Sequence, residues 1–189
     1  MTPFETSESS IGPLAAPSVV ITGVSPQKPH KLTRGFAGQF FVAGELSRLG
    51  LVAVITNGNC PHTDILCSNL RADRFVHIQV KTFRPGDATC SVGTKAESDY
   101  GDRFFWILAG VPEPGTAQQF MYYVIPSPIL APHIRADNEI GKTTPGRKGQ
   151  QRNQENTFRA VTLPPRTDRT GWSIAEYRNA WQLIAEELT

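Results

Sequence analysis

Three polar residues, Asp64, Gln79 and Lys81, carry side chains that are suited to chemistry on a phosphodiester. Hydrolysis of that bond needs a divalent cation held by oxygen atoms, an activated water and a positive charge near the phosphate. Mg²⁺ is bound by a few protein oxygens and keeps several of its waters. An Asp carboxylate, a Gln amide oxygen and a Lys ammonium therefore supply the required groups, provided that the chain brings them together.

A hairpin of two strands is expected to bring these residues together. The run 75–82 alternates apolar and polar residues, so that Gln79 and Lys81 project from one face and the apolar side chains from the other. Asp64 opens the preceding β-like run, fifteen residues before Gln79. If the two runs pair, the three groups meet at one edge of the sheet, where the backbone carbonyl of Val80 is a further oxygen ligand.

Each residue by itself also has an ordinary structural interpretation. Asp64 follows the turn at 61–63, where an acid commonly closes a turn or begins a strand, and Lys81 would be a solvated lysine on a strand. His62 and His77 lie nearby in the sequence, but isolated histidines are most often polar surface residues, and we assign them no catalytic role. The functional interpretation depends on Asp64, Gln79 and Lys81 acting jointly.

The surrounding sequence predicts an α/β domain. Apolar residues recur at helical spacing from Gln39 to a stop at Gly50, and turn residues separate the β-like runs that follow. A capping-box pattern opens a second helix near the C-terminus. The predicted elements are a helix at 39–50, strands at 51–56, 64–68, 75–82, 104–111 and 120–125, and a helix at 173–188. They form a helix, a three-strand meander and two strands that complete the sheet.

Composition and charge limit the class of protein. The 189 residues suffice for one domain with a sizeable core. A formal net charge of +2 argues neither for nor against nucleic acid. The three cysteines lack the spacing of a zinc site and the density of a disulfide scaffold, which indicates thiols in a reducing compartment. With no run of membrane-spanning length and no signal-peptide pattern, we expect a cytoplasmic protein without a membrane partner.

Two segments depart from the average composition. Residues 1–30 are rich in Ser, Thr and Pro and are interpreted as a flexible tail with one apolar patch at 19–24, which leaves 31–189 as a single domain. The segment 141–170 contains seven basic residues against two acids. It is either a phosphate-contacting arm or a solvated loop. The candidate nucleic-acid contacts in it are Lys142, Arg147, Lys148 and Arg152.

Several stretches resemble one nuclease superfamily. Pro61 to Asp64, followed by Ile78-Gln79-Val80-Lys81-Thr82, is similar to the PD-(D/E)xK motif in its variant with Gln at the second position. The stretch 37–50, together with Asn57-Gly58-Asn59, resembles a group of small bacterial proteins related to resolvase-like and intron-encoded endonucleases. The similarity continues through 122–127 and 145–150 to 181–183, and so covers most of the chain after residue 34.

The resemblance implies a fold and a set of roles. The fold would be a restriction-endonuclease-like mixed sheet of about five strands flanked by helices. Asp64 and Gln79 would be metal ligands, joined by the backbone of Val80, and Lys81 would orient or activate water near the scissile phosphate. Mg²⁺ or Mn²⁺ would be the cofactor and DNA the partner. Many nucleases on this scaffold act as dimers, which suggests a homodimer.

The first helix departs from the pattern of the superfamily. Many relatives carry Glu where this chain has Gln39, and the only acid on the helix is Glu45. These two residues fall on opposite flanks of the apolar stripe, so we do not expect both to point at the same site. Either Glu45 supplies a second negative charge or Asp64 is the only one. The sequence thus predicts a metal-dependent endonuclease that hydrolyses DNA, with an inactive nuclease-fold module that binds nucleic acid or a protein partner as the alternative.

Overall fold

The computed structural model describes residues 30–56, 58, 60–146 and 148–189. The predicted N-terminal tail lies outside the described residues apart from His30, and so does Arg147. Within the described ranges, no helix combines the length and the apolar character needed to cross a lipid bilayer.

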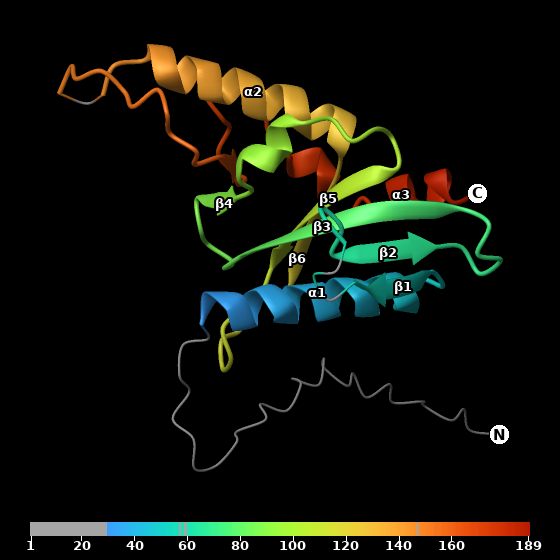
Figure 1. Cartoon of the computed structure of the whole chain (residues 1–189). Helices are drawn as coiled ribbons and strands as arrows, with labels where there is room; N and C mark the ends of the chain where they lie inside the picture. The colour runs from blue at the N-terminus through green and yellow to red at the C-terminus, as the bar shows by residue number, and fades with distance from the viewer. Residues whose placement is uncertain (1–29, 57, 59, 147) are drawn as a thin grey trace, which may run out of the picture.

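A five-stranded mixed sheet forms the centre of the fold (Figure 1). In the order in which they lie side by side, its strands are β1 (Val52–Ile55), β2 (Ile65–Ser68), β3 (Phe75–Phe83), β5 (Phe104–Gly110) and β6 (Met121–Pro126). Neighbouring strands are antiparallel except β3 and β5, which are parallel. The predicted α/β class, the three-strand meander and the two strands that complete the sheet are confirmed.

A crossover joins the parallel strands β3 and β5. It contains β4 (Thr89–Ser91) and the 3₁₀ helix η1 (Thr94–Glu97), neither of which was predicted. β4 pairs with β7 (Ala160–Thr162) in a separate two-stranded sheet. Parallel neighbours require such a connection because a tight turn can join only antiparallel strands.

Helices cover both faces of the main sheet. They are α1 (Lys31–Arg48), α2 (Ser127–Thr143) and α3 (Gln182–Glu187). On the first face, the apolar side chains of β3 pack with α1 and α3. On the second face, Trp106 and its neighbours in β5 and β6 pack with η1, β4, β7 and α2. α1 and α2 therefore lie on opposite sides of the sheet (Figure 1). Because successive residues of a strand alternate, Gln79 and Lys81 project from the second face.

Helix α1 begins at Lys31, well before the predicted start at Gln39. The side chain of His30 caps it by accepting a hydrogen bond from the backbone N–H of Leu32 at 3.4 Å. The first turns expose Leu32 and Phe36, at 68% and 55%, so no buried stripe marks them in the sequence. The helix ends at Arg48, before Gly50 at φ 86°, and the predicted stop at Gly50 is confirmed.

Helix α2 was not predicted, because prolines obscure it. Pro128 occupies the first turn, where a backbone N–H has no partner within the helix and proline is tolerated. Pro132 lies further inside and lacks the N–H that would bond the carbonyl of residue 128. Leu130 and Ile134 nevertheless bury one side of the helix against the second face of the sheet, and that burial stabilises it.

The predicted C-terminal helix at 173–188 is wrong for most of its length. Only a 3₁₀ turn, η2 (Ala175–Tyr177), and the short α3 form there. Between them, Arg178 bridges to Tyr123, and the N–H of Asn179 donates to the carbonyl of Tyr122 at 2.9 Å. Asn179 has a φ of 53°, which a continuous helix does not allow. The free edge of β6 therefore competes for this backbone and interrupts the helix.

The close approach of α1 to the sheet at Gly38 gives a test of the packing. A Cβ atom at this position would overlap Cγ2 of Thr82. We expect Gly38→Ala to destabilise the fold by about 1–3 kcal/mol, because it overpacks the interface. Thr82→Ser removes that methyl group, so the same substitution should cost less in the Thr82→Ser background. The measurement is urea denaturation followed by circular dichroism.

Gly44 is the matched control for this prediction, because it lies on the same helix and an added Cβ would meet no atom within 4 Å. Gly44→Ala should stabilise the protein by about 0.5–1 kcal/mol through its helix propensity alone. If Gly38→Ala stabilises by a similar amount, α1 does not pack against Thr82 as described.

Candidate functional site

Asp64 lies at the point where the pairing of β2 with β3 ends. Its N–H donates to the carbonyl of Ile78 at 2.9 Å, although Ile78 is already the register partner of Ile65. Two consecutive residues thus lie opposite one, which is the arrangement of a β-bulge, and bulges redirect a side chain. The carboxylate oxygen Oδ2 accepts a hydrogen bond from the N–H of Val80 at 2.8 Å. Asp64 therefore reaches across to β3, as the predicted hairpin requires.

Gln79 shares the carboxylate of Asp64. Its Nε2 donates to the same Oδ2 atom, and the residue is buried, with 7% of its surface exposed. In the register of the sheet, Gln79 is the partner of Trp106 in β5. A buried amide without a partner would be costly, so the bond to Asp64 satisfies one of its two donor hydrogens. The acid and the amide that the sequence placed together are thus in direct contact.

Lys81 is half-buried two residues further along the same face of β3. Its Nζ lies 5.9 Å from the centre of the Trp106 ring. Burial lowers the pKa of the Lys81 ammonium, and the negative charge of Asp64 partly opposes that shift. A lysine with a lowered pKa close to a carboxylate is better suited to handling protons than a solvated surface lysine is.

Two histidines and a tyrosine lie beside this cluster. Nδ1 of His77 is 3.1 Å from Oγ1 of Thr63, and Nδ1 of His62 is 3.3 Å from the hydroxyl of Tyr100. His77 shares the second face of β3 with Gln79 and Lys81. The sequence assigned neither histidine a role, and nothing in its spacing marked Tyr100 as a neighbour. The contact of Tyr100 with His62 forms because the crossover between β3 and β5 returns beside the turn at 61–63.

The structure does not bring Gln39 or Glu45 into the cluster. Both belong to α1, which packs on the first face, whereas Gln79 and Lys81 project from the second. The carboxylate of Glu45 accepts hydrogen bonds from the Arg48 guanidinium at 2.9 and 2.6 Å. The bond to Arg48 lowers the pKa of the Glu45 carboxyl. Of the two alternatives left open by the sequence, the geometry favours Asp64 as the only carboxylate that the described residues bring to the site.

The oxygen donors at the site are of the kind that Mg²⁺ takes. They are the carboxylate of Asp64, the amide oxygen of Gln79 and the carbonyl of Val80, which points to the same edge as the N–H that bonds Asp64. The described residues contain no group of three or more His, Cys, Asp or Glu side chains that could hold a metal ion. The donor set therefore fits Mg²⁺ or Mn²⁺ in type, but its single charge offsets little of the cost of dehydrating the ion.

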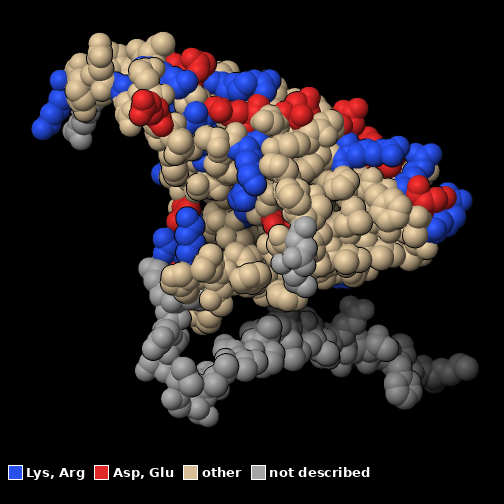
Figure 2. All heavy atoms as spheres, viewed as in Figure 1, with Lys and Arg blue, Asp and Glu red and all other residues tan. Residues whose placement is uncertain are grey.

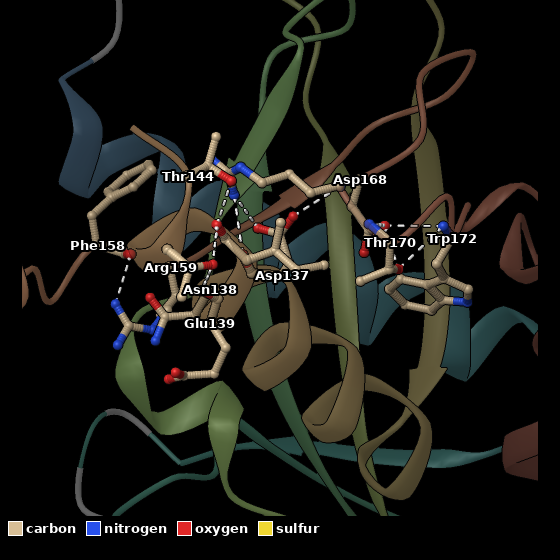
Figure 3. A network of polar contacts seen from close by, with 12 residues as sticks. Asp137, Asn138, Glu139, Thr144, Phe158, Arg159, Asp168, Thr170 and Trp172 are labelled. Atoms are coloured by element: carbon tan, nitrogen blue, oxygen red, sulfur yellow. Dashed lines mark hydrogen bonds and ion pairs between the residues drawn. The ribbon is translucent and has the colours of Figure 1, made fainter. Parts of the chain in front are cut away.

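A separate cleft of about 390 Å³ lies between α2 and the segments 152–160 and 167–169. Lys142 and Arg152, two of the four predicted nucleic-acid contacts, line it together with Arg159 and Arg169. Lys148 is exposed but does not line the cleft, and Arg147 lies outside the described residues. In Figure 3, Asp137 and Asn138 of α2 lie between Arg159 on one side and Asp168 on the other. The sequence did not predict a cleft, because α2 itself was not predicted.

Charges of both signs are interspersed over the surface. On the face shown in Figure 2, acidic and basic side chains alternate over α2, and most of the surface below is uncharged. All three cysteines lie within the described ranges and are free thiols, as predicted. Burial raises the pKa of the Cys90 thiol to about 12 and that of Cys67 to about 11, so neither is a reactive nucleophile at neutral pH.

No family model, no curated protein and no solved structure matches the chain significantly.

Proposed function

We propose that this chain is a metal-dependent endonuclease-like protein that hydrolyses DNA phosphodiester bonds beside Asp64, Gln79 and Lys81. The observation that carries the proposal is the contact of Asp64 with β3. Its carboxylate accepts hydrogen bonds from the amide of Gln79 and, at 2.8 Å, from the N–H of Val80. Lys81 projects from the same face as Gln79, so an acid, an amide and an amine converge.

Each group has a distinct role in the proposed reaction. Asp64, the amide oxygen of Gln79 and the carbonyl of Val80 would hold Mg²⁺ or Mn²⁺, which when bound neutralises phosphate charge and lowers the pKa of water. A Gln amide has an acceptor as well as two donors, so its bond to Asp64 leaves an oxygen for the ion. Lys81, whose pKa burial lowers, would orient the attacking water or accept its proton.

A restriction-endonuclease-like fold is part of the same proposal. The order of elements supports it: α1 precedes the meander β1 to β3, and β5 and β6 then complete the sheet. Helices on both faces agree with the flanked sheet that the resemblance implies. DNA as the partner and a homodimer as the functional state are predictions of this proposal.

The hydrogen bonds of Asp64 also favour a second candidate function. Oδ2 of Asp64 already satisfies the N–H of Val80 and the amide of Gln79, so the acid has a structural role at the end of the strand pairing. A non-catalytic module that binds nucleic acid or a protein partner needs no more than this from Asp64. Under this candidate function, DNA affinity depends on basic residues such as Lys148 and Arg152 rather than on Asp64.

Titration calorimetry with Mn²⁺ separates the two candidates. For the endonuclease, we expect weak but measurable binding to the wild type, and a loss of affinity of at least about tenfold in Asp64→Asn. Glu186→Gln, an equal change of charge at an exposed position of α3, is the control and should not alter binding. The same proteins are then incubated with supercoiled, branched and single-stranded DNA and Mg²⁺ or Mn²⁺.

The two assays have opposite expectations for the two candidates. Metal-dependent cleavage that disappears in Asp64→Asn supports the endonuclease. A folded protein that does not bind Mn²⁺ and does not cleave any of these DNAs contradicts the endonuclease. In that case, DNA affinity that survives Asp64→Asn but falls in Lys148→Glu and Arg152→Glu supports the binding module.

A further inference from the structure

The cleft beside α2 is separate from the Asp64 cluster. Cys90 and Thr89 are successive residues of β4 and so point to opposite faces of the small sheet. Cys90 is buried in the core of the second face together with Trp106, the register partner of Gln79, and so lies on the side of the Asp64 cluster. Thr89 lines the cleft. The sheet formed by β4 and β7 therefore stands between the two sites.

Two arginines in the cleft are held in fixed positions by acids. Arg159 is only 8% exposed; its Nε lies 2.5 Å from Glu97, and its Nη1 donates to the carbonyls of Asn156 and Phe158 at 2.6 and 3.0 Å. Arg169 donates through Nη1 to Asp137 of α2 at 2.5 Å. Guanidinium groups positioned in this way lose little conformational entropy when they bind an anion.

Gly141 provides the space that Arg169 occupies. A Cβ atom at Gly141 would lie 3.3 Å from Nη1 and 3.4 Å from Cζ of Arg169. The absence of a side chain thus lets the guanidinium lie against α2 at the floor of the cleft. A larger residue at position 141 would displace it.

One of the four cations that line the cleft has no acidic partner among the described residues. Lys142, Arg159 and Arg169 pair with Glu139, Glu97 and Asp137, whereas Arg152 forms no ion pair within the described ranges. The guanidinium of Arg152 makes no hydrogen bond to any of the described residues and is exposed. It is therefore available to an anionic ligand, and an arginine fork matches the oxygens of a phosphate.

An exposed aromatic ring lies in the same cleft. Phe158 is 60% exposed and lines the cleft next to the fixed Arg159 (Figure 3). A phenyl ring beside cations offers a stacking surface for a nucleic-acid base, since every base has a flat π-face. The volume of about 390 Å³ lies within the range of small-ligand sites, about 300–1,000 Å³.

We infer that this cleft binds a nucleotide, with its base against Phe158 and its phosphate at Arg152 and Arg169. The ligand is a nucleoside monophosphate, either free or at the end of a nucleic-acid strand, since both present the same groups. The inference does not depend on catalysis at Asp64 and holds if the proposed endonuclease activity is absent.

Titration calorimetry of the full chain with dAMP, deoxyadenosine and inorganic phosphate tests the inference. We expect dAMP to bind more tightly than either fragment. Phe158→Leu should weaken dAMP binding at least about fivefold and leave phosphate binding unchanged, because it removes only the stacking surface. Arg152→Gln should weaken both dAMP and phosphate. Phe40→Leu, an exposed phenylalanine on α1 at 64%, is the matched control and should change neither.

Further measurements separate the cleft from the Asp64 cluster and distinguish the two sources of the ligand. Asp64→Asn should leave dAMP affinity unchanged, which separates this site from the proposed nuclease site. A hexanucleotide with a 5′-phosphate that binds more tightly than dAMP assigns the cleft to strand ends, and weaker binding assigns it to free nucleotides. The inference is overturned if dAMP does not bind at millimolar concentration, or if Phe158→Leu and Arg152→Gln both bind it like the wild type.

Discussion

Replacing Lys81 with methionine is expected to lower the rate of Mg²⁺-dependent DNA cleavage by about 10²- to 10⁴-fold. Methionine keeps most of the apolar length of the side chain but lacks the ammonium group, which lies 5.9 Å from the centre of the Trp106 ring and interacts with the charge of Asp64. Nothing else on the second face of β3 carries a positive charge near the carboxylate and the amide. The measurement is a single-turnover cleavage assay with supercoiled DNA at saturating metal.

The stability of the same variant distinguishes lost chemistry from lost fold. Burial lowers the pKa of Lys81 in the folded state below its ordinary value of about 10.4 in the unfolded chain, so the unfolded chain binds the proton more tightly. The charged lysine therefore lowers the free energy of unfolding. This loss of stability is complete below the folded pKa and disappears as the pH rises from the folded pKa to the unfolded pKa. Lys81→Met removes this loss of stability and should therefore unfold no more easily than the wild type at pH 7.

Two outcomes would contradict this account of Lys81. Cleavage that persists in Lys81→Met at a rate near that of the wild type rules out its role in the reaction. A Lys81→Met protein that is markedly less stable at pH 7 shows that the ammonium group stabilises the fold, in which case any loss of activity has a structural cause. Lys31→Met, an exposed lysine at the start of α1 on the opposite face of the sheet, is the matched control and should affect neither measurement.

Truncation of Trp106 to alanine is expected to lower the free energy of unfolding by about 3–5 kcal/mol. The ring is 1% exposed at the centre of the second core, and its removal leaves a cavity between β5 and the elements that cover it. Its loss also removes the surface against which Lys81 packs. Urea denaturation monitored by circular dichroism measures the effect, because the change removes a fluorophore.

Trp106→Phe is the informative companion to this prediction. The indole Nε1 of Trp106 is buried and has no hydrogen-bond partner among the described residues. Phenylalanine removes that unsatisfied donor at the expense of some buried ring surface, and the two effects oppose each other. We expect a change within about 1.5 kcal/mol of the wild type. A cost close to that of Trp106→Ala would mean that Nε1 has a partner and stabilises the fold through it.

Local patterns in the sequence were sufficient for the five strands of the main sheet and for the central cluster. The alternation in 75–82 placed Gln79 and Lys81 on one face. The short connection between the strand that Asp64 opens and the run 75–82 favoured a hairpin of these two strands. The alternation follows from the two-residue period of a strand, and neither signal depends on the rest of the chain. The stop at Gly50 likewise follows from a backbone conformation that glycine adopts without strain.

The features that depend on distant contacts were not visible in the sequence. Helix α2 contains Pro132 and is stabilised by burial against β5 and β6, whereas the predicted C-terminal helix is interrupted because Asn179 bonds the edge of β6. Local helix propensity predicts neither the burial that stabilises α2 nor the bond to β6 that interrupts the C-terminal helix.

The polar positions of β3, and the place of Asp64 one strand and one turn before them, could thus be read from the chain alone. The packing of α1 on the opposite face became clear only in the folded protein, and it leaves Glu45 bonded to Arg48 and Asp64 as the acid of the cluster among the described residues. The physical reason is that helical periodicity shows which side of a helix is buried, but not which face of a sheet will bury it.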